Sequence, residues 1–198
     1  MIVAVFILLA IPVGYLLGGR LRNIKNYTTR FLGLPIAAFL LESAAPFLRH
    51  LLSAPVGQWH WMLVTAEYLL LFAFCVLNRK SWPVWILFAA CVLNFFVIAL
   101  YGFQMPVAPF ARDIPQMAAT IARIDSGELF RYTVASAADP FWFLGDVIVV
   151  PLKRFGGLAS VGDILLGLGS AALFCTWMLT PKPAEPANRK PGAEQKTP

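Results

Sequence analysis

The sequence predicts an all-α fold: a polytopic helical membrane protein with about five transmembrane helices and one short external amphipathic helix. The chain has 198 residues, of which 59% are hydrophobic and only 13% are charged, whereas soluble domains carry about 25% charged residues. Its mean hydropathy is +0.72. The apolar residues also come in long blocks rather than in a 3.6-residue stripe, which is typical of helices surrounded by lipid.

Five blocks are long enough to cross a bilayer, whose hydrocarbon core requires about 17 to 25 residues of helix. The predicted spans cover residues 2–19, 31–48, 59–77, 82–101 and 158–179. No Lys or Arg precedes Arg20, and the first block lacks an A-x-A cleavage site, so we interpret it as a retained span rather than a signal peptide. We therefore expect a single integral membrane domain over residues 1–180.

Basic residues near the span ends predict the orientation. They lie in the loop after the first span, in the turn after the third and in the tail: Arg20, Arg22, Lys25, Arg30, Arg79, Lys80, Lys182, Arg189, Lys190 and Lys196. Because such residues gather on the cytoplasmic side, we expect a multi-pass protein of the cell inner (plasma) membrane with its N-terminus outside. Residues 102–157 then lie outside, and residues 181–198, which have no apolar period, form a disordered cytoplasmic tail.

The external segment contains one predicted helix and two Gly-Asp pairs. Asp113 is a predicted N-cap, and apolar residues at helical spacing from Ile114 to Ala122 predict a short amphipathic helix that ends near Gly127. Further on, the apolar run 147–150 is too short to span a membrane. We expect it to form a dipping hairpin or an irregular edge that protein or water covers.

The Gly-Asp pairs, Gly145-Asp146 and Gly162-Asp163, lie seventeen residues apart. Ser160 makes an S-x-x-D capping box with Asp163 at the start of the last span, and an ion- or ligand-binding role is the alternative for this acid. Asp146 has no such cap, so it either forms a salt bridge to Lys153 or Arg154 or belongs to an ion or ligand site. Since Pro151 and the residues after it can reverse the chain, we expect Asp146 and Asp163 to converge at the outer membrane boundary.

Two further acids lie inside predicted spans, where ionisable groups are costly and indicate function. Glu42 lies twelve residues after Arg30, about 18 Å along a helix, and Glu67 lies eleven residues before Asn78, about 16 Å. In an antiparallel hairpin of the second and third spans, the two acids therefore reach almost the same depth. Such a pair suits a proton or cation site, and it equally suits two neutral acids that hydrogen-bond the helices together. His60 lies seven residues before Glu67, on the same helical face.

No spacing indicates a cofactor or a metal site. His50 and His60 match no haem or metal motif, and we interpret Cys75, Cys91 and Cys175 as small buried hydrophobic residues. The net charge of +6 comes without a nucleic-acid motif, so it indicates topology and lipid attraction. Catalytic motifs are also lacking.

One set of residues resembles a known family. Met105-Pro106-Val107-Ala108-Pro109, Leu144-Gly145-Asp146, Pro151 and Ser160-x-Gly162-Asp163 occur in this order. Together they resemble the M-P-V-[SA]-P … L-G-D … S-x-G-D signature of an uncharacterised family of small bacterial multi-span membrane proteins. The resemblance covers mainly residues 101–179, and it implies a bacterial cell membrane and no chemistry. Members often have Asn-Gly-Gly before the Met-Pro, where this chain has Tyr101-Gly102-Phe103.

Three function classes remain open. The first is a small transporter or an ion- or lipid-handling protein that uses Asp146, Asp163, Glu42 and Glu67. The second is a non-catalytic accessory or assembly subunit, whose Gly167-x-x-x-Ala171 pattern would permit close packing within the chain, in a homo-oligomer or with a membrane-protein partner. The third is a membrane enzyme acting on a lipid-linked substrate, for which Asp146, Asp163, His50 and His60 are the only nucleophile or acid candidates near the outer face. Beyond these, the expected partner is the lipid bilayer and not nucleic acid.

Overall fold

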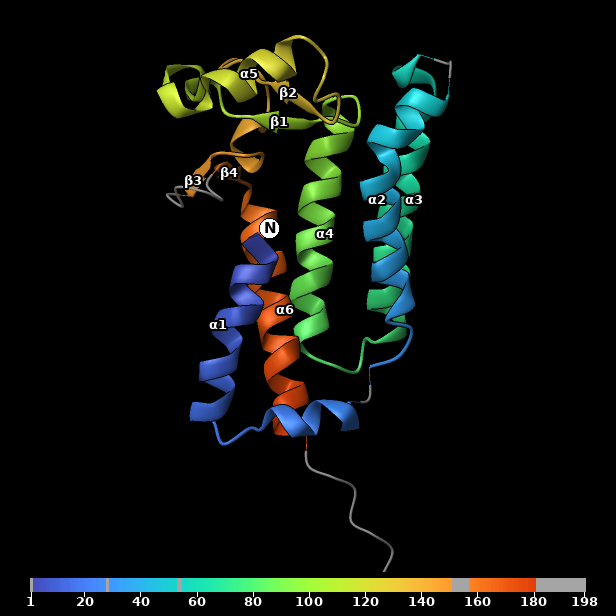
Figure 1. The fold of residues 1–198 in the computed structure, drawn as a ribbon, viewed down its shortest axis with the longest axis vertical. Coiled ribbons are helices and arrows are strands. Elements are labelled where there is room, and N and C mark those ends of the chain that lie inside the picture. Colours follow the sequence, from blue (N-terminus) through green and yellow to red (C-terminus); the bar gives the residue numbers. More distant parts are fainter. Residues whose placement is uncertain (1, 28, 53–54, 151–156, 181–198) are drawn as a thin grey trace, which may run out of the picture.

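The computed structural model describes residues 2–27, 29–52, 55–150 and 157–180, and it is mostly helical. Its α-helices are α1 (Ile2–Leu16), α2 (Gly33–Leu51), α3 (Val56–Leu77), α4 (Pro83–Leu100), α5 (Ala118–Asp125) and α6 (Val161–Leu179). All except α5 stand side by side as a bundle, and α5 lies across one end of it (Figure 1). The short 3-10 helix η1 (Leu21–Asn26) lies across the other end.

The bundle is a row in which α1 packs on α6, α6 on α4, α4 on α3, and α3 on α2. Two small residues of α6 allow α1 and α4 to approach it closely. A Cβ at Gly167 would overlap the Phe6 ring of α1, and one at Gly169 would overlap Leu87 of α4. The small residues of α6 are therefore used for packing within the chain.

Three helices, α3, α4 and α6, are long and apolar enough to cross a membrane, among the residues that the structure describes. The other two predicted spans fall short for different reasons. Helix α1 is apolar but has 15 residues, which corresponds to about 22 Å. Helix α2 has 19 residues, but Glu42, Arg49 and His50 make it less apolar. The predicted count of about five spans is thus not confirmed by length and composition.

Residues 102–147 fold into a small cap over one end of the bundle (Figure 1). It contains β1 (Met105–Val107), η2 (Pro109–Asp113), η3 (Pro115–Met117), α5, β2 (Tyr132–Val134) and η4 (Trp142–Leu144). Strands β1 and β2 pair in parallel, Met105 opposite Tyr132, with α5 in the crossover that parallel strands require. Val107 packs against Ile121 and Ile124 of α5.

The predicted amphipathic helix is present, but it starts later than expected. Ile114 has an extended backbone (φ −92°, ψ 109°), because the ring of the following Pro115 disfavours the helical region at that position. The α-helix therefore begins at Ala118, and its N-cap is Met117, without a side-chain hydrogen bond. The prediction that Asp113 caps this helix is wrong. The predicted end is correct, since α5 stops at Asp125 and Gly127 has φ +73°.

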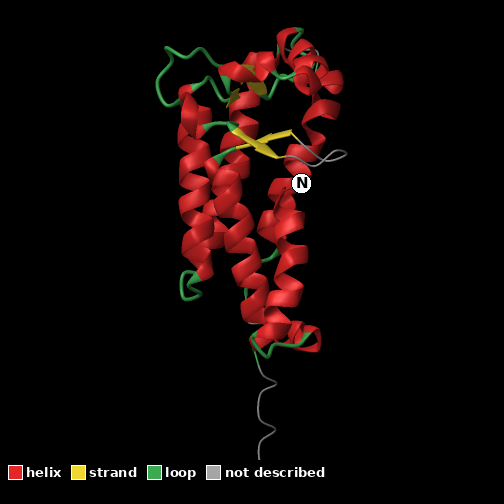
Figure 2. Ribbon diagram, turned by 90° about the vertical axis from the view of Figure 1, so that its left-hand side faces the viewer, coloured by secondary structure: helices red, strands yellow, loops and turns green. Residues whose placement is uncertain are grey.

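The hairpin predicted between the two Gly-Asp pairs is also present. Strands β3 (Ile148–Val150) and β4 (Gly157–Ala159) pair antiparallel (Figure 2). The chain therefore returns from the first Gly-Asp pair to the second. The residues 151–156 between the strands, and with them the salt bridge predicted from Asp146 to Lys153 or Arg154, lie outside the described residues, as does the predicted tail 181–198.

Candidate functional site: an acidic cavity beneath the cap

A cavity of about 210 Å³ lies where α2, α3, α4 and α6 meet the cap. Its charged and amide side chains come from all of these elements: Glu42, Glu67, Asn94, Arg131, Asp146 and Asp163. The four acids singled out from the sequence thus line one cavity. Two of them come from the hairpin of α2 and α3, and the other two come from the Gly-Asp pairs.

The first Gly-Asp pair is held against the Met-Pro segment of β1. A Cβ at Gly145 would overlap the carbonyl of Pro106, so only glycine permits this approach. The Asp146 N–H donates to the Pro106 carbonyl at 2.8 Å, and the Ala108 N–H donates to the Asp146 carbonyl at 3.0 Å. These two bonds fix the backbone of Asp146 beside β1 and place its side chain at the cavity.

The side chain of Asp146 is the least compensated acid of the site. The residue is 8% exposed, and its Oδ1 has no hydrogen-bond partner among the described residues. Burial first, and then the nearby Asp163 carboxyl, raise the pKa of Asp146 well above its usual value. Both effects favour the neutral, protonated carboxyl.

The second Gly-Asp pair confirms the predicted capping box and adds a partner to it. Asp163 N–H donates to Ser160 Oγ at 2.9 Å, and Ser160 N–H donates to Asp163 Oδ2 at 3.2 Å. Asn94 of α4 donates to Asp163 Oδ1 at 3.0 Å and accepts from Ser160 Oγ at 2.9 Å. Gly162 is required because a Cβ there would overlap Asn94. Asp163 thus caps α6 while it lines the cavity.

Glu67 forms a buried ion pair that the sequence analysis missed. Arg131, directly before β2, donates to both oxygens of Glu67 at 3.0 and 2.8 Å; the two side chains are 22% and 6% exposed, respectively. Burial opposes the charge of Arg131, but the carboxylates of Glu67 and Glu42 raise its pKa nonetheless. Glu42 and Glu67 share the cavity without a hydrogen bond between them in the described part of the chain. The sequence did contain one indication that Arg131 is buried, because it is a single basic residue between two aromatic residues, Phe130 and Tyr132.

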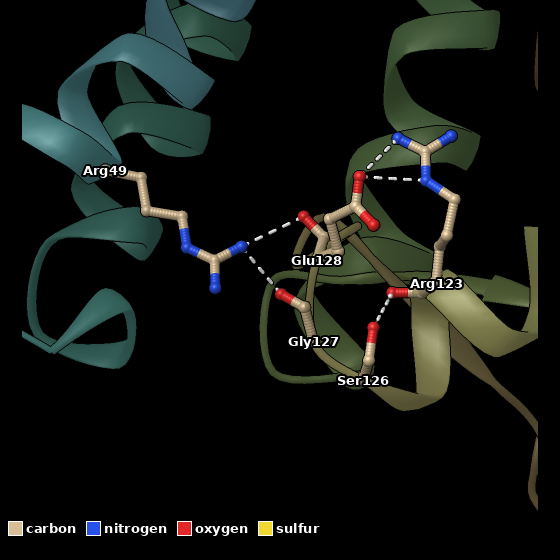
Figure 3. Close-up of polar contacts among 5 residues, drawn as sticks. All are labelled: Arg49, Arg123, Ser126, Gly127 and Glu128. Carbon is tan, nitrogen blue, oxygen red and sulfur yellow. Dashed lines mark hydrogen bonds and ion pairs between the residues drawn. The ribbon is translucent and has the colours of Figure 1, made fainter.

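A larger groove, of about 810 Å³, adjoins the cavity on the side of the cap and α2. Glu42, Arg131 and Tyr132 line both spaces, and we call this shared part of their walls the neck. In Figure 3, Arg49 at the end of α2 donates to the carbonyls of Gly127 and Glu128, at 2.7 and 3.0 Å. This contact fastens α2 to the turn after α5, beside the groove.

The two histidines do not join the acids. His50 lines the groove, whereas His60 is buried, and its ring packs edge-on against Phe130 at 5.2 Å. Among the described residues, no three His, Cys, Asp or Glu side chains lie close enough together to hold a metal ion. The acids of the cavity are therefore spread around its wall rather than gathered at one point.

A family model matches residues 26–175, three quarters of the chain, and this region includes every acid of the cavity together with Asn94 and Arg131. The chain belongs to DUF5317, a family of unknown function. The match extends beyond residues 101–179, where the motifs lie. No curated protein and no solved structure matches the chain. Because membership in DUF5317 assigns no chemistry, the function has to be argued from the site.

Proposed function

We propose that this chain is a multi-pass protein of the cell inner membrane in which α1, α2, α3, α4 and α6 all span the bilayer. Large apolar side chains on the outward faces of α1 and α2 support it. Leu8 and Leu16 of α1 and Phe39 and Phe47 of α2 are all at least 65% exposed. Large contiguous apolar surfaces are rare on soluble monomers, and lipid would cover these.

We propose further that the protein is a small transporter whose cavity binds a cation in exchange for a proton. The observation that carries this proposal is the imbalance of charge around one cavity. Four carboxyl groups line the cavity, and Arg131 is its single basic residue in the described part of the chain. Two of these acids are buried, Glu67 and Asp146, and only Glu67 has an ion-pair partner in the described part of the chain. An uncompensated buried carboxylate is costly, so a bound cation or a proton has to offset the charge of Asp146.

Asp146 is the group that would exchange its proton. Burial and the nearby Asp163 raise the pKa of its carboxyl and so favour the neutral form. Glu42 from α2 and Glu67 from α3 also face this space, and Arg131 offsets one of these charges. A cation that enters through the neck favours the ionised form of Asp146, so its binding releases a proton. By linkage, protonation of Asp146 expels the cation.

Proton release by the purified protein tests this proposal. The protein, in a neutral detergent and a weak buffer with a pH indicator, is titrated with a panel of chloride salts, namely sodium, potassium, magnesium and ethylammonium. We expect at least one cation to release protons from the wild type and Asp146→Asn to release far fewer. Asp113→Asn, an exposed acid of the cap, is the matched control and should behave as the wild type.

Equal proton release by the wild type and by Asp146→Asn, or no release with any cation, would overturn the exchange mechanism. Liposomes that contain a trapped pH indicator extend the test to transport. A cation gradient should then drive proton movement that Asp146→Asn abolishes and Asp113→Asn retains.

A further inference from the structure

Aromatic residues form one part of the cavity wall. Tyr68, Phe103 and Tyr132 line it together with the acids. Two of these rings join through Phe95, which lies 5.1 Å from the Tyr68 ring and 6.5 Å from the Phe103 ring, centroid to centroid. The acids therefore share the cavity wall with aromatic rings, and the faces of such rings attract cations.

Phe103 occupies its place in this wall against its backbone preference. It has φ +67° and follows Gly102, which has φ +63°. A left-handed backbone suits glycine and is unfavourable for a bulky side chain. Strain of this kind clusters at ligand sites, where the surrounding structure holds it in place.

The size of the cavity and the spacing of its acids restrict the cation. A bare metal ion requires several oxygen ligands at 2.0 to 2.6 Å, and the described acids form no such cluster. The volume of about 210 Å³ is far larger than one ion, yet smaller than the pockets of about 300 to 1,000 Å³ that hold drug-sized ligands. One organic cation is already part of the cavity wall, because the guanidinium group of Arg131 pairs there with Glu67. Asp146 Oδ1 is the buried acceptor left without a donor among the described residues.

We propose that the cavity binds a small organic ammonium ion, a protonated amine of a few carbon atoms. Its N–H groups donate to Asp146, and its alkyl part lies against Tyr68 and Phe103. This inference rests on the proposed cation exchange and specifies the cation. An ammonium ion can donate directed hydrogen bonds to acids that lie apart from one another, and its alkyl part can bury apolar surface against the rings. An alkali ion has neither N–H donors nor apolar surface, so such a site stabilises it less.

Isothermal titration of the purified protein in neutral detergent tests the inference, with ethylammonium chloride and potassium chloride as probes. We expect ethylammonium to bind at least about tenfold more tightly than potassium. Phe103→Gly should weaken ethylammonium binding by about five- to thirty-fold, the range of a cation–π contact that is shielded from water. It should leave the melting temperature unchanged or higher, because the left-handed backbone is relieved.

Phe31→Gly is the matched control. Phe31 also has a left-handed backbone, φ +57°, but it is 59% exposed and belongs to the loop at the opposite end of the bundle. This variant should gain the same backbone relief and keep full ethylammonium affinity.

Equal binding of both probes, or Phe103→Gly with wild-type affinity, overturns the ammonium assignment. If potassium still releases protons from the wild type and not from Asp146→Asn, the exchange mechanism survives that failure. If no cation of the panel releases protons, both proposals fail together.

Discussion

At the scale of single residues, exposure decides what each ion pair contributes. Arg112 and Asp125 pair at 2.7 Å on the open surface of the cap, with both side chains about half exposed. Arg131 and Glu67 pair at 2.8 Å with little exposure. Exposed pairs contribute about 0 to 1 kcal/mol. Breaking a buried pair costs about 3 to 5 kcal/mol, because a charge is left without compensation.

The first prediction concerns this buried pair. Arg131→Gln should destabilise the protein by about 3 kcal/mol or more, measured as the free energy of unfolding in mixed micelles. Glu67→Gln combined with Arg131→Gln should recover most of that loss, since no charge then stays buried. Arg112→Gln is the control and should cost far less, because its ion pair is exposed to water. A loss for Arg131→Gln as small as that of the control would contradict the buried pair.

The second prediction concerns pH and Asp146. Its pKa in the folded protein is raised above the unfolded value of 3.8, so the folded state binds the proton more tightly. Stability is therefore full below about pH 4 and is lost as the pH rises through the folded pKa. Asp146→Asn should match the wild type in melting temperature at pH 4 and exceed it at pH 8.

Asp125→Asn provides a control of opposite sign. Arg112 lowers the pKa of Asp125, so this acid stabilises the protein above its unfolded pKa and loses that effect as the pH falls. A wild-type melting temperature that exceeds that of Asp146→Asn at pH 8 would refute the buried, proton-binding carboxyl.

Local residue pairs could be predicted from the sequence, and distant ones could not. The Ser160 and Asp163 capping box depends on three residues of spacing, and helical geometry fixes the rest. Glu42 and Glu67 could be placed at one depth because the rise of a helix is regular. Arg131 reaches Glu67 across 64 residues, and this contact depends on how the cap folds back. No spacing in the sequence gives that path.

At the scale of elements, two glycines bring the motif segments together. Gly145 lets the chain approach β1, and Gly162 lets the first turn of α6 approach Asn94. The sequence predicted that the chain reverses between the two Gly-Asp pairs, because Pro151 and the residues after it permit a turn. The three-residue strands β1 and β2 were not predicted, since strands this short show no alternation. Their parallel pairing, like the late start of α5, depends on the tertiary fold and on Pro115.

The third prediction tests the close approach at Gly145. Gly145→Ala would place a methyl group on the backbone carbonyl of Pro106, which cannot move as a flexible side chain can. We expect a loss of about 1 to 3 kcal/mol in stability, the usual cost of overpacking, together with weaker cation binding because Asp146 shifts. Gly57→Ala in the first turn of α3 meets nothing within 4 Å and should be neutral or slightly stabilising. Equal stability of the two variants would show that the segment containing Gly145 moves freely.

At the scale of the whole molecule, the basic residues and the exposed apolar side chains lie at different levels of the bundle. The loop that follows α1 and the turn that follows α3 lie at the end of the bundle away from the cap (Figure 1). Both carry basic residues, Arg20, Arg22, Lys25, Arg79 and Lys80 among them. The apolar outward faces lie between that end and the cap. The distribution of basic residues therefore favours a cytoplasmic basic end and an external cap.

The last prediction tests this orientation with single cysteines. The native Cys75, Cys91 and Cys175 are buried, so replacing them with Ala provides a background without reactive thiols. In that background, Ser136→Cys in the exposed part of the cap should react with a membrane-impermeant maleimide in intact cells. Lys80→Cys, in the turn after α3, should react only after the cells are opened, because it lies at the opposite end of the bundle. Labelling of Lys80→Cys but not of Ser136→Cys in intact cells would invert the orientation, and the cavity would then open toward the cytoplasm.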